Sequence, residues 1–233
     1  MLPIFQNLAA VQTRIEEAAS RAGRSGKDIL LVGATKTVEP SRIQTAVDGG
    51  LLYIGENRVQ ELCEKYDAVE GAHWHFIGHL QTNKVKYIID KAELIHAVDS
   101  ERLLDEIARQ AEKRGMTAHV LLEINASGEE SKFGMPFDMV RRVIEGNETR
   151  EHVRIEGLMT IGPHTKDERI VRRAFAQMRA LYETLGEETY AHSRMQYLSM
   201  GMSGDFIWAI EEGANVVRIG SAIFGHRESG GNE

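Results

Sequence analysis

Cysteine is almost absent from this chain of 233 residues, since Cys63 is the only one. No disulfide can form within the chain, which is consistent with a reducing compartment. We expect Cys63 to be a small apolar residue on a helix rather than a reactive thiol. The sequence also lacks an apolar run long enough to cross a membrane, and its acidic N-terminal residues are not typical of a signal peptide. We therefore expect a cytoplasmic protein that does not bind membranes.

An excess of positive charge is also missing. The chain has 28 Lys and Arg residues against 35 Asp and Glu residues, which gives a formal net charge of −7 at pH 7. A general nucleic-acid-binding protein usually presents a basic face, so this balance argues against one. Proline is scarce, with 4 residues, and no Pro/Gly/Ser-rich linker or low-complexity segment divides the chain. We predict a single domain over residues 1–233.

The sequence does contain a regular alternation of apolar runs and amphipathic helices. It begins with a predicted helix over about residues 3–22, in which Leu8, Val11, Ile15 and Ala18 form one apolar stripe. Helices such as ERLLDEIARQAEKRG then separate a series of strand-like runs. These runs are DILLVGATK, LLYIGEN, HWHFIG, LIHAVDS, HVLLEINAS, VRIEGLMTI, QYLSMGMS and NVVRIGSAIFG.

Eight strands, each separated from the next by a helix, predict a parallel sheet, and eight is the number that closes a (β/α)8 TIM barrel. The alternative is an open, doubly wound sheet. We predict a barrel over about residues 28–226, with the extra helix before it and a short disordered tail at 227–233.

Barrels of this kind place their site at the C-terminal ends of the strands. Side-chain alternation then selects three inward-facing sets, which are Val32, Ala34 and Lys36, then Tyr53, Gly55 and Asn57, and then Val216, Arg218 and Gly220. Lys36 would lie at the end of a buried strand. Burial lowers the pKa of a lysine amine and makes it a nucleophile, although the side chain could instead simply extend to water.

The last two strands carry a second signal. SMGMSGD leads from a strand into a helix, with Ser203 or Asp205 placed as its N-cap, and Gly220 and Ser221 follow the final strand. Barrels frequently bind phosphate with these loops, although the glycines are equally compatible with ordinary turns. A ligand with an aldehyde and a phosphate would engage both Lys36 and this segment. Pyridoxal 5′-phosphate is such a ligand, and a sugar-phosphate aldehyde or ketone is another.

Six segments, in order, resemble one known family: GATKT, GENRVQE, WHFIGHLQTNK, GLMTIGP, LSMGMSGDF and VRIGSAIFG. The chain resembles the pyridoxal phosphate homeostasis proteins, single-domain relatives of the alanine racemase barrel, over essentially its whole length. The resemblance implies a fold-type III barrel that binds pyridoxal 5′-phosphate.

Carried over residue by residue, the resemblance also implies the roles of individual side chains. Lys36 would form the internal aldimine, and Asn57 would lie near the ring hydroxyl. The phosphate would be held by Ser203, Gly220 and Ser221, with help from backbone amides near Gly201 and Gly204. Met200 would pack nearby, although alternation places it and Ser203 on opposite faces, so one of the two must lie past the strand end.

Arg218 would face the pyridine nitrogen. An arginine only donates hydrogen bonds, so it cannot help that nitrogen to keep a proton, and the ring becomes a weaker electron sink than one paired with an aspartate. This disfavours deep carbanion stabilisation. Considered without the family, Arg218 would instead be a buried arginine paired with Glu123 or Glu156.

The resemblance further bears on catalysis. Relatives that racemise or decarboxylate amino acids carry a second, mostly β domain, and the present sequence ends just after the eighth strand. We expect no catalytic residue and a monomer that holds the cofactor for homeostasis and for delivery to apo-enzymes. The alternatives are a weak amino-acid racemase or lyase that uses the same aldimine, and a Schiff-base aldolase acting on a sugar phosphate.

Three other groups of residues have simpler interpretations. His73 and His75 lie on one strand face, but no third ligand is evident, so we expect no metal site. Asn83 and Lys84 could meet an anion or begin a solvated helix. The segment Ser127–Met135 is predicted to be a surface loop, in which the family match marks Lys132 and Gly134 without a role.

Overall fold

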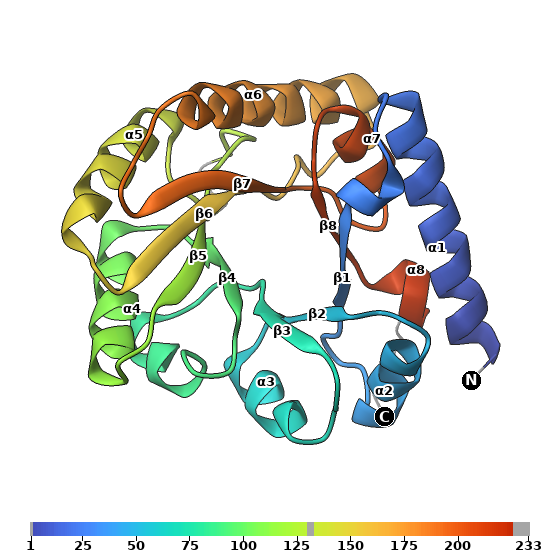
Figure 1. Cartoon of the computed structure of the whole chain (residues 1–233). Helices are drawn as coiled ribbons and strands as arrows, with labels where there is room; N and C mark the ends of the chain where they lie inside the picture. The colour runs from blue at the N-terminus through green and yellow to red at the C-terminus, as the bar shows by residue number, and fades with distance from the viewer. Residues whose placement is uncertain (1, 130–132, 226–233) are drawn as a thin grey trace.

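Eight parallel strands form a closed barrel in this protein. The computed structural model describes residues 2–129 and 133–225 (Figure 1). Each strand pairs with the next in sequence, and β8 pairs with β1, so the ring closes. The strands are β1 Leu30–Ala34, β2 Tyr53–Glu56, β3 His73–Phe76, β4 Leu94–Val98, β5 Ala118–Glu123, β6 Val153–Met159, β7 Ser193–Ser199 and β8 Val216–Ile219. The predicted barrel is confirmed and the open sheet is wrong.

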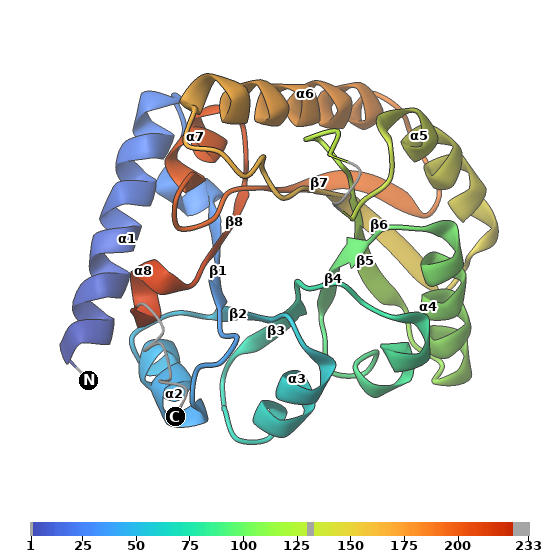
Figure 2. The same ribbon diagram turned by 180° about the vertical axis from the view of Figure 1, so that it is seen from behind.

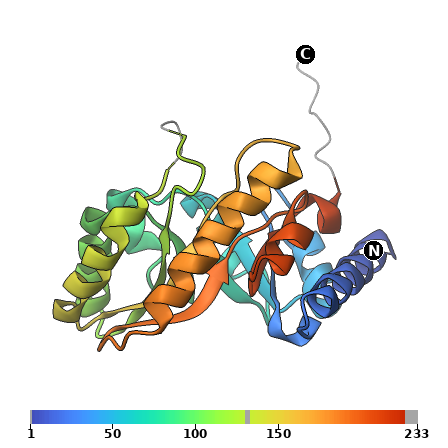
Figure 3. The same ribbon diagram turned by 90° about the horizontal axis from the view of Figure 1, so that it is seen from above.

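Helices surround this ring on its outer side (Figures 1 and 2). The α-helices are α1 Leu2–Arg21, α2 Pro40–Asp48, α3 Val59–Tyr66, α4 Glu101–Lys113, α5 Phe137–Gly146, α6 Glu168–Gly186, α7 Phe206–Glu211 and α8 Ser221–Phe224. Short 3₁₀ helices are η1 Gly26–Asp28, η2 Thr82–Tyr87 and η3 Asn147–Thr149. Figure 3 shows the ring edge-on, with α6 running across the outside of the sheet.

One predicted connection differs from the structure. β3 and β4 are joined by the 3₁₀ helix η2 and not by an α-helix. The buried side chains Val85 and Ile88 are three residues apart, which matches the three-residue turn of a 3₁₀ helix. Asn83 and Lys84 lie in η2.

The extra N-terminal helix is confirmed as α1. Its predicted stripe of Leu8, Val11, Ile15 and Ala18 is at most 4% exposed and packs into the layer between helices and sheet. The Asn7 side chain donates a hydrogen bond to the carbonyl oxygen of Ile223, 3.0 Å away. Helix α1 therefore covers the seam where β8 meets β1, beside α7 and α8 (Figure 1).

The barrel interior is built from inward-facing side chains of every second residue. Val32, Val216 and Ile77 form one cluster, with Tyr53 and Ala34 packed against it. A second cluster consists of Leu94, Ala97, Leu121 and Met159. The inward positions predicted for β1, β2 and β8 are therefore confirmed for these apolar side chains.

Two sequence-based expectations fall on residues that the structure does not describe, and a third concerns a membrane-spanning helix. The predicted tail at 227–233 and Lys132 lie outside the described residues. In the described ranges, no helix is both long enough and apolar enough to cross a membrane.

Candidate functional site

A cavity of about 910 Å³ opens at the C-terminal ends of β1 and β8, next to the loop that follows β7. Six of the eight residues that the family resemblance nominated line it, and they are Lys36, Ser203, Gly204, Arg218, Gly220 and Ser221. These side chains come from segments nearly two hundred residues apart in sequence. The closure of the barrel brings them together, because β1 and β8 are hydrogen-bonded neighbours.

Met200 and Asn57, the other two nominated residues, do not line this cavity. β7 ends at Ser199, so both Met200 and Ser203 lie past the strand. Met200 is fully buried in the layer between sheet and helices. Asn57 follows β2, where its backbone N–H donates to Glu56 Oε2 at 3.2 Å and its main chain lies close to Gly78.

Lys36 is exposed, and the expectation of a lysine buried at a strand end is wrong. β1 ends at Ala34, two residues earlier, and Lys36 lies in the turn that leads to α2. Thr35 takes the buried position instead, where its hydroxyl contacts Glu56 Oε1 at 2.7 Å. The protein therefore presents the Lys36 amine at an open mouth instead of removing it from water.

The turn that carries Lys36 is held from both sides by a buried ion cluster. Lys65 on α3 donates to Glu56 Oε1 at 2.7 Å, to Glu61 Oε2 at 2.9 Å and to the carbonyl oxygen of Thr35 at 2.9 Å. Glu61 Oε2 also accepts the backbone N–H of Thr37 at 2.7 Å. The residues immediately before and after Lys36 are thus tied to the same cluster.

The backbone conformation of Thr37 also depends on this cluster. Its φ of 61° lies in the left-handed region that non-glycine residues seldom adopt. Such a conformation persists when surrounding bonds determine it, and the hydrogen bond from Thr37 to Glu61 is one of these. The cluster therefore fixes the direction in which the backbone leaves β1 at Lys36.

Burial shapes the electrostatics of the cluster. Desolvation raises the pKa of Glu56, and hydrogen bonds from Lys65 and Thr35 oppose that rise. Partial burial also raises the pKa of Glu61, but the bonds from Lys65 and Thr37 outweigh it, so this pKa lies below its ordinary value. Sequence reasoning missed the cluster, although Glu56 and Glu61 lie within the GENRVQE segment and Lys65 follows Glu61 by one helical turn.

Arg218 forms the floor of the cavity. It is 4% exposed, and its guanidinium donates to Ser199 Oγ at 2.5 Å and to the carbonyl oxygen of Thr160 at 2.9 Å. Burial lowers its pKa to about 10, and the charges of Glu123 and Asp205 oppose that decrease. Arg218 is therefore a cation at neutral pH, and its other N–H groups have no hydrogen-bond acceptor among the described residues.

The ion pairs considered for Arg218 from sequence alone are not formed. Glu156 pairs elsewhere, with His119 at 2.6 Å and with Arg194 at 2.5 Å. Glu123 acts on Arg218 through charge, and within the described ranges it makes no salt bridge to it. The guanidinium is thus held by neutral groups.

The opposite rim of the cavity is made of small residues. Ser203 Oγ accepts the backbone N–H of Ala222 at 3.4 Å, which ties the loop after β7 to α8. Asp205, and not Ser203, is the N-cap of α7, and its Oδ1 accepts the N–H of Met202 at 2.6 Å. The Ser221 N–H precedes the first hydrogen bond inside α8 and has no acceptor within that helix. Such a backbone N–H, in a cavity that Lys36, Arg42 and Arg218 also line, suits an anion.

These groups fit a compact ligand that has an aldehyde at one end and a phosphate at the other. Lys36 supplies an exposed amine, and Arg218 supplies buried donors. The small residues Ser203, Gly204, Gly220 and Ser221 line the same cavity. Pyridoxal 5′-phosphate also has a ring nitrogen that can accept from an arginine.

Comparisons with known proteins identify the family of this chain. The family model described as alanine racemase, N-terminal domain, matches residues 6–228. A pyridoxal phosphate homeostasis protein of Aquifex aeolicus is 44% identical over 225 residues, which cover 96% of this chain and 98% of that protein. The chain belongs to the pyridoxal phosphate homeostasis protein family. The family predicted from the six sequence segments is thereby confirmed.

Two solved structures are similar to this family member. The crystal structure of an unknown protein from Bifidobacterium adolescentis has a TM-score of 0.90 and 38% identity, and the match covers 95% of this chain and 94% of that one. The structure of PipY from Synechococcus elongatus with pyridoxal phosphate bound has a TM-score of 0.79 and 30% identity, with coverage of 91% and 100%.

The remaining sequence candidates have structural partners in this family member. His73 Nδ1 lies 2.9 Å from a carboxylate oxygen of Glu93. His75 Nδ1 lies 3.0 Å from His96 Nε2, inside the barrel. The described ranges contain no cluster of three or more His, Cys, Asp or Glu side chains suited to a metal ion. Cys63 is half-buried on α3, with its Sγ 3.5 Å from the carbonyl oxygen of Tyr87.

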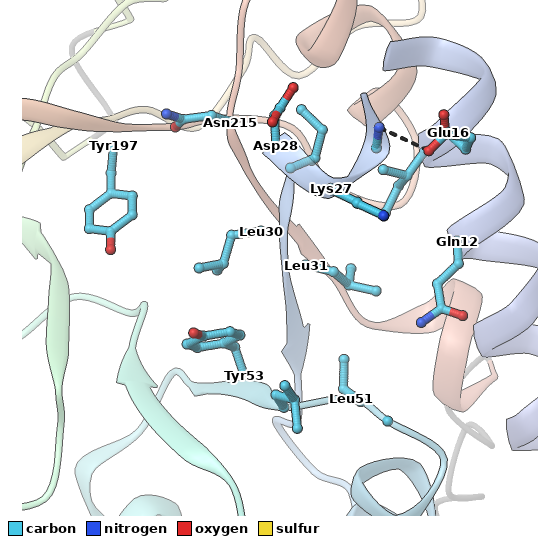
Figure 4. Close-up of a pocket in the computed structure, with 15 residues that line it drawn as sticks. Gln12, Glu16, Lys27, Asp28, Leu30, Leu31, Leu51, Tyr53, Tyr197 and Asn215 are labelled. Atoms are coloured by element: carbon cyan, nitrogen blue, oxygen red, sulfur yellow. Dashed lines mark hydrogen bonds between the residues drawn. The ribbon is translucent and has the colours of Figure 1, made fainter. Parts of the chain in front are cut away.

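A second cavity, of about 530 Å³, lies at the N-terminal ends of the strands (Figure 4). Leu30, Tyr53 and Tyr197 line it from the barrel side, and Lys27 lines it from the segment after α1 (Figure 4). In barrels of this type, the N-terminal face serves stability and the opposite face serves chemistry. The cavity with Lys36 is therefore the candidate site.

Proposed function

We propose that this chain binds pyridoxal 5′-phosphate in the cavity between Lys36 and Arg218, and that it serves cofactor homeostasis rather than catalysis. The observation that carries the proposal is the convergence of an amine, a donor-only cation and a rim of small residues on one cavity. The names of the curated relatives and the cofactor bound to PipY support it.

The proposed role of Lys36 is covalent attachment. The cofactor supplies a reactive aldehyde, and the Lys36 amine would hold it as a Schiff base. The ion cluster around Lys65 would keep the Lys36 turn in place while the ligand enters or leaves. Because Lys36 is exposed at an open mouth, we include exchange of the cofactor with solvent, and its delivery to apo-enzymes, in the proposal.

The remaining residues would bind and orient. Ser203, Gly204, Gly220 and Ser221 would hold the phosphate, and Arg218 would donate to the ring nitrogen. An arginine has no acceptor and cannot help that nitrogen to keep a proton. The site would therefore stabilise a carbanion poorly, which suits either a protein that only holds the cofactor or a racemase that limits side reactions.

A titration with pyridoxal 5′-phosphate tests the proposal. We expect the unmodified chain to develop the near-visible absorption of a lysine-bound pyridoxal, and Lys36→Ala to lack it. Lys27→Ala is a matched control, because Lys27 is an exposed lysine at the opposite end of the barrel (Figure 4). A chromophore that survives in Lys36→Ala would overturn the assignment of Lys36.

The alternative function, a weak racemase or lyase, shares the same site. It is separated by incubating the loaded protein with single enantiomers of amino acids. We expect the added amino acid to keep both its configuration and its concentration over many hours. Turnover that disappears in Lys36→Ala would replace the carrier proposal with the catalytic one.

A further inference from the structure

A chain of buried polar groups crosses the barrel interior below the candidate site. Arg218 Nη1 lies 2.5 Å from Ser199 Oγ, Ser199 Oγ lies 3.0 Å from His96 Nδ1, and His96 Nε2 lies 3.0 Å from His75 Nδ1. These residues come from β8, β7, β4 and β3, and β4 and β7 are not neighbours in the sheet. Each of them is at most 4% exposed.

Because Arg218 can only donate, the donor and the acceptor of each hydrogen bond in this series can be assigned. A guanidinium only donates, so Ser199 Oγ accepts from it. Ser199 is fully buried, and in the described part of the chain His96 Nδ1 is the one acceptor within reach of its O–H. A buried hydroxyl hydrogen without an acceptor is costly, so the O–H points to His96 Nδ1.

The same reasoning assigns the tautomers of the His96 and His75 rings. A His96 ring that accepts at Nδ1 carries its proton on Nε2 and donates it to His75 Nδ1. His75 then carries its own proton on Nε2. Burial lowers the pKa of His75 to about 3, and it lowers the pKa of His96 well below the ordinary value, so both rings are neutral.

We propose that His96 is a positioning residue for Arg218, which it holds through the hydroxyl of Ser199. The anchor has two points, because the carbonyl oxygen of Thr160 accepts from the other Nη atom at 2.9 Å. A guanidinium fixed at both Nη atoms has a set plane, and its free N–H groups remain for a ligand in the cavity. The inference rests on the proposed function where it takes that ligand to be the ring nitrogen of pyridoxal phosphate.

The donor and acceptor roles along this series of hydrogen bonds can be tested without a ligand, through the tautomers of the two histidines. We expect nitrogen NMR of the full-length, ligand-free protein to show His75 and His96 as neutral rings with the proton on Nε2. In Ser199→Ala, the acceptor role of His96 Nδ1 is lost, and we expect the His96 tautomers to mix. A proton on Nδ1 of His96 in the unmodified protein would overturn the proposed direction.

The positioning role is tested with two ligands, pyridoxal 5′-phosphate and its analogue with carbon in place of the ring nitrogen. A hydrogen bond that involves a charged group contributes about tenfold or more in affinity. We therefore expect His96→Leu to weaken pyridoxal phosphate about tenfold and the analogue hardly at all. His96→Asn, whose side-chain oxygen can still accept from Ser199, should keep most of the affinity.

Controls separate the possible failures. His73→Leu changes a histidine on the exposed end of β3 and should bind both ligands normally. Equal weakening of both ligands in His96→Leu and His96→Asn would show that His96 is merely structural. Absence of a lysine-bound chromophore in the unmodified protein would instead refute the proposed function, while the tautomer measurement would still decide the direction of the chain.

Discussion

Glu123 at the end of β5 gives a prediction that can be worked out quantitatively. The side chain is 4% exposed, and the pairing of Val98 with Leu122 places the end of β4, and so Asp99, beside it. Burial and the charge of Asp99 raise the pKa of Glu123 to about 7, while Arg218 opposes the rise. No hydrogen bond reaches its carboxylate from the described residues.

The sign of the pH effect follows from the direction of this shift. The folded protein holds the Glu123 proton more tightly than the unfolded chain, whose carboxyl has a pKa near 4.5. Protonated Glu123 therefore stabilises the folded state fully below a pH of about 4.5, and this stabilisation is lost as the pH rises through about 7. A change of this size corresponds to about 3 kcal/mol in the free energy of unfolding, since one pKa unit is worth about 1.4 kcal/mol.

Glu123→Gln removes the ionisation and keeps the shape. We expect the stability of the variant, relative to the unmodified protein, to rise by about 3 kcal/mol between about pH 4 and about pH 9. Urea unfolding at a series of pH values, at constant ionic strength, measures this difference. Glu183→Gln on the exposed face of α6 is the control, because it makes the same chemical change outside the barrel. Parallel stability curves for Glu123→Gln and the unmodified protein would refute the assigned burial.

Two further predictions concern the backbone that carries the site. Lys65→Met leaves Glu56 buried without its cation, so we expect urea unfolding to show a loss of about 3 to 5 kcal/mol together with weaker cofactor binding; unchanged stability would contradict the ion cluster. Gly201→Ala should lower stability by about 2 kcal/mol or more, because Gly201 has a φ of 96° and an added Cβ would lie 2.5 Å from that of Ala209. Gly204→Ala, where an added Cβ meets no atom within 4 Å, should change the midpoint of thermal unfolding little, and equal effects of the two substitutions would contradict this reading.

The barrel could be predicted from sequence because its period is regular. Apolar runs alternate with helices, and inward positions such as Val32 and Val216 follow from alternation along each strand. The ends of the strands could be predicted less accurately than the strands themselves. Alternation predicts Lys36 at the end of a buried strand, whereas β1 ends at Ala34 and the buried residue after it is Thr35, whose hydroxyl bonds to Glu56.

The supporting contacts of the site were beyond sequence reasoning for a physical reason. Arg218 was visible as an inward cation, but its partners depend on the register of β6, β7 and β8, which sets Ser199 and Thr160 beside it. The same register leaves Glu156 at a different place in the barrel. Lys65 is an ordinary helical lysine in sequence, and only the packing of α3 against the turn after β1 reveals its role.

Attachment of pyridoxal phosphate to Lys36 is the central claim, and borohydride reduction tests it most directly. Reduction of the loaded protein fixes a pyridoxyl group on the amine that held it, and peptide mass spectrometry then locates that group. We predict one dominant modified peptide, with the adduct on Lys36. An unmodified Lys36, or a dominant adduct on another lysine, would contradict the account.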